Sequence, residues 1–127
     1  MEHFKVLIVD DENDFLETII NRLKKRDIDV TGVTNGEAAL KSLKEKAVDV
    51  VVLDIKMPGR LDGIETLREI KKEYPFTEVI LLTGHASVET SIEGMKLGAF
   101  DYMLKPVKLE ELIMKISQAF TKKKDRR

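Results

Sequence analysis

The sequence contains no cysteine and no tryptophan among its 127 residues, and its formal net charge is only -1. Without cysteine there can be no disulfide scaffold, no thiolate zinc site and no cysteine nucleophile. A charge so close to zero gives no general attraction to nucleic acid or to membranes. No apolar run approaches the roughly 20 residues of a membrane span, and no charged-then-apolar leader opens the sequence. We therefore expect a cytoplasmic protein that contacts neither nucleic acid nor membrane directly.

What is present is the composition of an ordinary globular domain. Hydrophobic residues make up 43% of the chain and charged residues 35%, which is usual for soluble globular proteins. A chain of this length forms one domain with a proper hydrophobic core. We place that domain at residues 1–121 and expect residues 122–127 to be a basic C-terminal tail or the start of a linker.

Apolar, strand-like runs alternate with amphipathic helical patterns along the whole chain. The expected strands are 4–9, 29–33, 48–53, 79–82 and 101–104, and the expected helices are 14–26, 37–45, 63–73, 87–97 and 109–120. Short alternating units of this kind imply parallel strands with helices on both faces of the sheet. The predicted class is α/β, a doubly wound five-stranded parallel sheet with five helices. In such sheets the functional crevice lies beyond the carboxyl ends of the strands.

Polar side chains follow four of these runs at the point where each run ends. They are Asp10 and Asp11, Asp54, Thr83 and Lys105. Singly, each has an ordinary explanation as a helix cap, a turn residue or a surface lysine, but jointly they converge on one edge of the sheet. Carboxylate oxygens without histidine or cysteine suit Mg²⁺ or Mn²⁺, and a carboxylate can accept a phosphoryl group. The pattern predicts a site for a divalent cation and a phosphoryl group.

Four segments around these positions resemble the receiver domain of two-component response regulators, the family that contains the chemotaxis response regulator. They are Val-Asp-Asp-Glu at 9–12, Val-Leu-Asp-Ile-Lys-Met-Pro-Gly at 52–59, Leu-Thr-Gly-His-Ala at 82–86 and Tyr-Met-Leu-Lys-Pro at 102–106. The resemblance covers residues 4–120. It implies a flavodoxin-like fold with strand order 2-1-3-4-5, an order already described for the chemotaxis regulator.

The resemblance also implies which residues bind the metal and which accepts the phosphoryl group. Asp54 matches the phospho-accepting aspartate and is a metal ligand as well. Asp11 matches the direct metal ligand, and Asp10 matches the acid that acts mostly through water. The backbone carbonyl of Ile55 matches a further ligand of the Mg²⁺ or Mn²⁺ ion.

Other positions are implied to switch the domain or to tune the lifetime of the phosphoryl group. Thr83 matches the hydroxyl that moves toward the phosphoryl group, and Lys105 the lysine that pairs with it. Tyr102 matches an aromatic switch whose ring turns inward when Thr83 moves. Lys56 and His85, two residues after the acceptor and the threonine, line the approach of hydrolytic water in similar proteins. We hypothesise that these long or bulky side chains slow hydrolysis.

The implied function is phosphorelay signalling. A sensor histidine kinase or phosphotransfer protein would supply the phosphoryl group, and the domain would catalyse only its own phosphorylation and dephosphorylation. The face made by the fourth helix, the fifth strand and the last helix would then control a partner protein or an output domain, as a monomer or a phosphorylation-dependent dimer. Gly94 lowers the intrinsic stability of the fourth helix by roughly 1 kcal/mol relative to alanine, which we hypothesise aids this switch.

One departure from the family pattern and three alternatives remain at this level. Arg60 and Leu61 both stand before Asp62-Gly63, where the family has a single residue, so the third helix could start elsewhere or partner contacts could differ. The alternatives are a haloacid-dehalogenase-like phosphatase, a flavodoxin-type flavin carrier and an interaction module that is never phosphorylated. The segments around Thr83 and Tyr102 resemble receivers joined to transcription activators, so the domain is either a stand-alone receiver or part of a longer regulator.

Overall fold

Five parallel strands form one sheet in the order β2-β1-β3-β4-β5. The structure is a computed structural model that describes residues 5–57, 61–84 and 88–125. The strands are β1 (Lys5–Val9), β2 (Asp29–Val33), β3 (Val50–Asp54), β4 (Glu78–Thr83) and β5 (Asp101–Leu104). The helices are α1 (Asn13–Lys24), α2 (Gly36–Glu45), α3 (Gly63–Glu73), α4 (Val88–Lys96) and α5 (Leu109–Asp125). The predicted fold class and strand order are confirmed.

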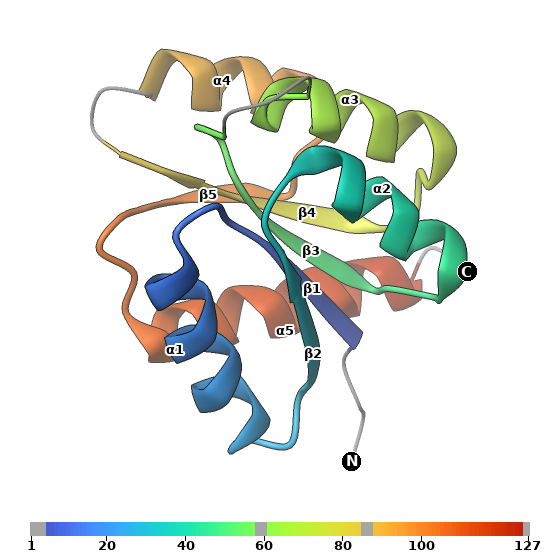
Figure 1. Cartoon of the computed structure of the whole chain (residues 1–127). Helices are drawn as coiled ribbons and strands as arrows, with labels where there is room; N and C mark the ends of the chain where they lie inside the picture. The colour runs from blue at the N-terminus through green and yellow to red at the C-terminus, as the bar shows by residue number, and fades with distance from the viewer. Residues whose placement is uncertain (1–4, 58–60, 85–87, 126–127) are drawn as a thin grey trace.

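Helices cover both faces of the sheet, with α1 and α5 on one face and α2, α3 and α4 on the other (Figure 1). Alternate strand residues point to opposite faces, so the central strands feed two separate cores. On the α1–α5 side the strands contribute Val6, Ile8, Val50, Val52, Ile80 and Leu82. On the other side they contribute Leu7, Val9, Val51, Leu53, Val79 and Leu81. The near-continuous apolar runs of β1, β3 and β4 therefore reflect burial on both faces.

Side-chain caps fix where α2 and α3 begin at the carboxyl edge of the sheet. Asn35 accepts a hydrogen bond from the N–H of Ala38 at 2.8 Å. Asp62 and Glu65 form a capping box at the start of α3, an arrangement that satisfies two backbone N–H groups at once. Helix α3 starts at Gly63, as predicted, so the additional residue before Asp62 does not displace it.

The structure describes one of the two residues that precede Asp62 in this loop, namely Leu61. The N–H of Leu61 donates to Oε1 of Glu37 at 3.2 Å, which ties this position to the start of α2. Arg60 lies outside the described residues.

Gly94 has a packing role that the sequence did not reveal. A Cβ at this position would lie 2.3 Å from Cδ1 of Leu81, far inside van der Waals contact. The absence of a side chain therefore lets α4 approach β4 closely.

None of the helices in the described part of the chain combines the length and the apolar character that a membrane crossing requires.

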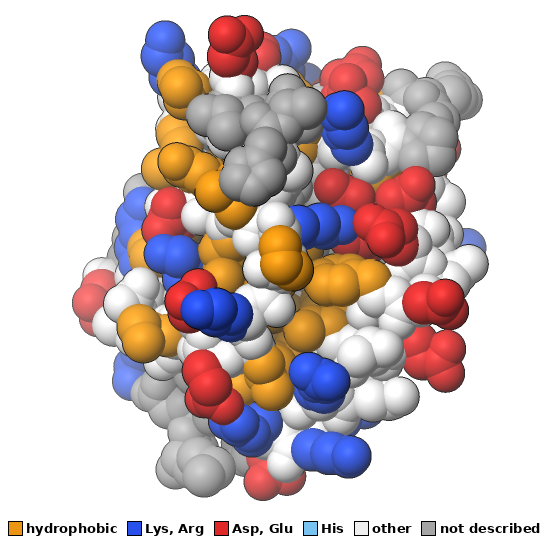
Figure 2. Space-filling view, turned by 90° about the vertical axis from the view of Figure 1, so that its left-hand side faces the viewer, with side chains coloured by type: hydrophobic (Ala, Val, Ile, Leu, Met, Phe, Trp, Pro, Cys, Tyr) orange, Lys and Arg blue, Asp and Glu red, His pale blue; other side chains and the backbone are white. Residues whose placement is uncertain are grey.

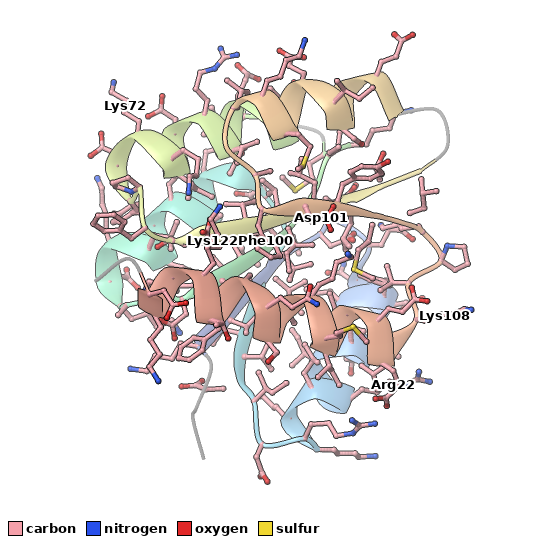
Figure 3. All side chains as sticks on the ribbon, turned by 180° about the vertical axis from the view of Figure 1, so that it is seen from behind. Arg22, Lys72, Phe100, Asp101, Lys108 and Lys122 are labelled. Carbon is pink, nitrogen blue, oxygen red and sulfur yellow. The ribbon has the colours of Figure 1, made fainter. Side chains whose placement is uncertain are left out.

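Helix α5 continues to Asp125 and so runs past the predicted end at residue 120. The basic residues of this extension contact the amino edge of the sheet. Nζ of Lys123 lies 2.7 Å from Oδ1 of Asp49, and Nζ of Lys122 lies 3.6 Å from Oε2 of the buried Glu78. Lys122 also lies over the ring of Phe100, 5.6 Å from its centroid (Figure 3). These contacts hold the last turn in a helix.

Candidate functional site

Three carboxylates meet at the carboxyl edge of the sheet. Asp10 directly follows β1 and is fully buried, Asp54 is the last residue of β3 and is 6% exposed, and Asp11 is exposed. One carboxylate oxygen from each lies within 4.8 Å of the others. Figure 2, which views this side of the molecule, shows acidic side chains grouped around a basic one. The structure thus brings together the three predicted side-chain ligands of a cation.

The electrostatics of this cluster favour a bound cation. Burial raises the pKa of Asp54 to about 6, and the negative charges of Asp10 and Asp11 contribute to the rise. The nearby Lys105 and a hydrogen bond from the N–H of Lys56, at 3.2 Å from Oδ1, act in the opposite direction. An all-oxygen set whose mutual repulsion is only partly neutralised is the donor set that a hard divalent cation prefers.

Lys105 supplies the positive charge of the site. Its Nζ lies 2.9 Å from Oδ2 of Asp10 and 3.7 Å from Oδ2 of Asp54. Its backbone N–H donates to the carbonyl of Thr83 at 2.8 Å, which fixes the chain after β5. Burial lowers the pKa of Lys105, but the hydrogen bond to Asp10 and the charges of Asp54 and Asp10 outweigh this, so its pKa is raised overall. Lys105 therefore stays cationic beside the acidic cluster.

Asp10 is held on both of its oxygens. Oδ2 accepts from Lys105, and Oδ1 accepts from the N–H of Glu12 at 2.9 Å. Its carboxylate consequently has a fixed orientation at the start of α1.

Thr83 ends β4 next to the acceptor strand. The register pairs Asp54 with Leu82, so Thr83 lies one position further along the neighbouring strand. Thr83 is 1% exposed. Its hydroxyl donates to the carbonyl of Gly84 at 3.0 Å. In this state the hydroxyl is thus engaged locally. The structure places it at the predicted edge of the sheet.

Tyr102 lies on the same face of the sheet as Thr83. The register pairs Tyr102 with Leu81, and side chains two positions apart on a strand share a face. The partly buried ring of Tyr102 packs against the core cluster that contains Leu81. This placement is compatible with an aromatic side chain that responds to a movement of Thr83.

Two further predicted site positions, Ile55 and Lys56, directly follow the acceptor Asp54 in the chain. The carbonyl of Ile55 accepts a hydrogen bond from the N–H of Gly63 at 3.1 Å, so one of its two lone pairs is used at the start of α3. The role of this carbonyl as a further ligand of the cation stays a prediction. The side chain of Lys56 is exposed beside the acceptor. His85 lies outside the described residues.

Two residues of the site were given no role from the sequence. Oε1 of Glu12 lies 3.2 Å from Nζ of Lys105, and the ring centroid of Phe15 lies 4.8 Å from the same atom. Glu12 belongs to the segment that carries the family resemblance, which was the available signal. Helical spacing indicates only that Phe15 lies on the packing face of the first helix, and it does not show which distant residue contacts that face.

Comparison with known proteins agrees with this geometry. Residues 6–117 match the family described as "Response regulator receiver domain". The chain is 40% identical over 120 residues to a putative NtrX-like response regulator of Rickettsia conorii, covering 94% of this chain and 25% of that protein. It is 37% identical over 118 residues to the transcriptional regulatory protein ZraR of Klebsiella oxytoca, covering 93% and 26%. The chain spans about a quarter of the length of these curated relatives.

A solved structure shows the same fold. The crystal structure of a response regulator receiver domain protein from Clostridium thermocellum superposes with a TM-score of 0.92 at 38% identity, and the match covers 98% of this chain and 99% of that one. None of these comparisons supports a haloacid-dehalogenase phosphatase or a flavin carrier. The acidic cluster, the strand order and the matching family agree, and the chain belongs to the receiver domains of two-component response regulators.

Proposed function

We infer that Asp54 accepts a phosphoryl group from a phosphohistidine of a sensor histidine kinase or phosphotransfer protein. The observation that carries this proposal is the surroundings of its carboxylate. Two other carboxylates have oxygens within 4.8 Å of it, and the Lys105 ammonium lies 3.7 Å away. A nucleophile, a cation site and a fixed positive charge are the parts that phosphoryl transfer to a carboxylate requires.

In the proposed reaction one oxygen of Asp54 attacks phosphorus and forms a new P–O bond. The bond from phosphorus to the donor atom breaks, and its electron pair leaves with the imidazole nitrogen or, for acetyl phosphate, with acetate. The product is an acyl phosphate on Asp54. Because the pKa of Asp54 is about 6, the carboxylate is mostly ionised and nucleophilic at neutral pH. Lys105 neutralises part of the charge on the transferred group.

Asp10, Asp11 and Asp54 are the residues that we propose hold Mg²⁺ or Mn²⁺. Such an ion neutralises phosphoryl oxygens and aligns them with the acceptor. The carbonyl of Ile55 stays a predicted additional ligand. The domain would act only on its own acceptor and not as an enzyme on a separate substrate.

The response to phosphorylation would begin at Thr83. Its hydroxyl must leave the carbonyl of Gly84, 3.0 Å away, to donate to a phosphoryl oxygen. That rotation opens space on the face where Tyr102 lies, and the ring can turn inward. Apolar side chains are exposed on α4, β5 and α5, namely Ile92, Met95, Leu104 and Met114. We propose that this face controls a partner protein or the output domain of a longer regulator.

Intact mass after incubation with acetyl phosphate and Mg²⁺ tests the proposal. The expected result is a single phosphoryl adduct that disappears without Mg²⁺ and in Asp54→Asn. Asp49→Asn is the matched control, since Asp49 is also a nearly buried acid but lies at the opposite edge of the sheet. It should still take up the adduct. An adduct that persists in Asp54→Asn would assign the acceptor elsewhere, and no adduct with any donor would favour the unphosphorylated interaction module.

A further inference from the structure

Three groups surround the ammonium of Lys105 besides the acceptor. Asp10 and Glu12 accept hydrogen bonds from it at 2.9 Å and 3.2 Å. The ring of Phe15 covers it from the side of α1, with 4.8 Å between Nζ and the ring centroid. The lysine side chain is only 22% exposed. The start of α1 therefore contributes to the surroundings of Lys105, although Lys105 lies far from it in the sequence.

Phe15 is itself held in place. Its ring packs against the core cluster beneath α1 and α5, which includes Leu16, Ile19 and Met103. A ring fixed between the core and an ammonium cannot move aside easily. The face of an aromatic ring carries negative potential and attracts a cation that lies over it. The ring of Phe15 thus attracts the ammonium of Lys105 without carrying a negative charge itself.

The two other contacts differ in strength. The fully buried Asp10 holds the ammonium at the acidic cluster, with 2.9 Å between Oδ2 and Nζ. The side chain of Glu12 is 66% exposed, so water screens its attraction. The ring of Phe15 covers the ammonium on the side of α1. It therefore limits the movement of the flexible lysine side chain away from Asp54.

We propose that Phe15 is a positioning residue that holds the ammonium of Lys105 within reach of Asp54. Its effect on the rate of phosphorylation rests on the proposed function of Asp54, whereas the contact between the ring and the ammonium does not.

The first test is a double-mutant cycle on the rate of phosphorylation by acetyl phosphate at saturating Mg²⁺. Phe15→Leu keeps an apolar side chain and removes the ring, and it should slow the reaction by about three- to tenfold. Phe15→Tyr keeps the ring and should restore the rate. In a Lys105→Met background Phe15→Leu should have no further effect, because the ammonium on which the ring acts is gone. An equal slowing in both backgrounds would overturn the proposal.

Phe120→Leu is the matched control. Phe120 also packs partly buried against the same core cluster, but it lies near the end of α5 and far from the edge that holds Asp54. This variant should phosphorylate at the wild-type rate, which separates the loss of the ring at the site from a general loosening of the core. If Phe15→Leu does not fold, Phe15→Met serves in its place.

The second test does not depend on phosphorylation. In the NMR spectrum of the unmodified protein, the ring current of Phe15 should shift the Cε protons of Lys105 upfield. The shift should persist in Phe15→Tyr and vanish in Phe15→Leu. Identical Lys105 shifts in wild type and Phe15→Leu would refute the contact. If the wild type takes up no phosphoryl group while the shift behaves as expected, the function proposed for Asp54 is wrong. The contact between the Phe15 ring and the Lys105 ammonium is then still supported.

Discussion

Asp10, which directly follows β1, and Asp54, the last residue of the neighbouring β3, hold carboxylate oxygens within 4.8 Å of each other. Two nearly buried carboxylates this close disfavour the ionised form of at least one of them. The structure assigns the effect to Asp54, whose pKa is raised to about 6, first by burial and then by the charge of Asp10. The site therefore stores unfavourable electrostatic energy at neutral pH when no cation is bound.

The raised pKa of Asp54 predicts how the stability of the folded domain depends on pH. In the unfolded chain Asp54 has its ordinary pKa of 3.8, so between about pH 4 and pH 6 the folded state binds a proton that the unfolded state does not. Stability from this group consequently rises as pH falls through that window. In EDTA, the free energy of unfolding of wild type relative to Asp54→Asn should increase by about 1–3 kcal/mol from about pH 7.5 to pH 4.5.

Denaturant titrations at several pH values measure this difference. Excess Mg²⁺ should raise the stability of wild type at neutral pH and flatten the pH dependence, because the cation favours the ionised carboxylate. A wild type that loses stability relative to Asp54→Asn on acidification would contradict the raised pKa.

The lifetime of the phosphoryl group is predicted to depend on Lys56. Its N–H donates to Oδ1 of Asp54 at 3.2 Å, and its exposed side chain begins beside the acceptor. We expect Lys56→Ala to shorten the half-life of the adduct by roughly threefold or more, because hydrolytic water gains access. Loss of the adduct with time, followed by mass, measures this. Lys72→Ala, an exposed lysine on α3, is the control, and an unchanged half-life in Lys56→Ala would remove the hypothesis. The same prediction holds for His85→Ala.

Gly94→Ala should destabilise the domain, although alanine favours helices. The added methyl would lie 2.3 Å from Cδ1 of Leu81, and overpacking of this kind costs about 1–3 kcal/mol. Gly84→Ala is the control, because a Cβ there meets no atom within 4 Å. Thermal unfolding of the two variants distinguishes the cases. A more stable Gly94→Ala would instead support the hypothesis that this glycine weakens α4 for switching.

The main elements of the fold and site could be predicted because they depend on local pattern. Apolar runs covered on both faces identified β1, β3 and β4, and parallel strands deliver their final residues to one edge, which gathered Asp10, Asp54 and Thr83. Contacts between distant segments could not be predicted in this way. Helical spacing assigns Phe15 to the core face of α1, but only the three-dimensional path of the chain after β5 places Lys105 over its ring.

The end of α5 shows the same limitation from another side. Residues 122–127 look like a solvated basic tail when only their composition is considered. In the structure the helix continues to Asp125, since Lys123 and Lys122 reach acids on the amino edge of the sheet. Those acids, Asp49 and Glu78, precede or begin strands that the sequence assigned to the core, and nothing local connects them to a helix far along the chain.

The pair of Lys123 and Asp49 gives the last prediction. Their side chains are 13% and 11% exposed, with 2.7 Å between Nζ and Oδ1, and Oδ2 of Asp49 accepts from the N–H of Lys5 at 3.0 Å. Lys123→Met would remove one charged partner of a nearly buried carboxylate, which should lower the free energy of unfolding by about 1–3 kcal/mol. Lys41→Met, at an exposed position of α2, should change it by less than about 0.5 kcal/mol. Because Asp49 joins the start of β1 to the end of α5, hydrogen exchange in Lys123→Met should also rise in the last turn of α5. Unchanged exchange there would mean that the helix extension does not depend on this ion pair.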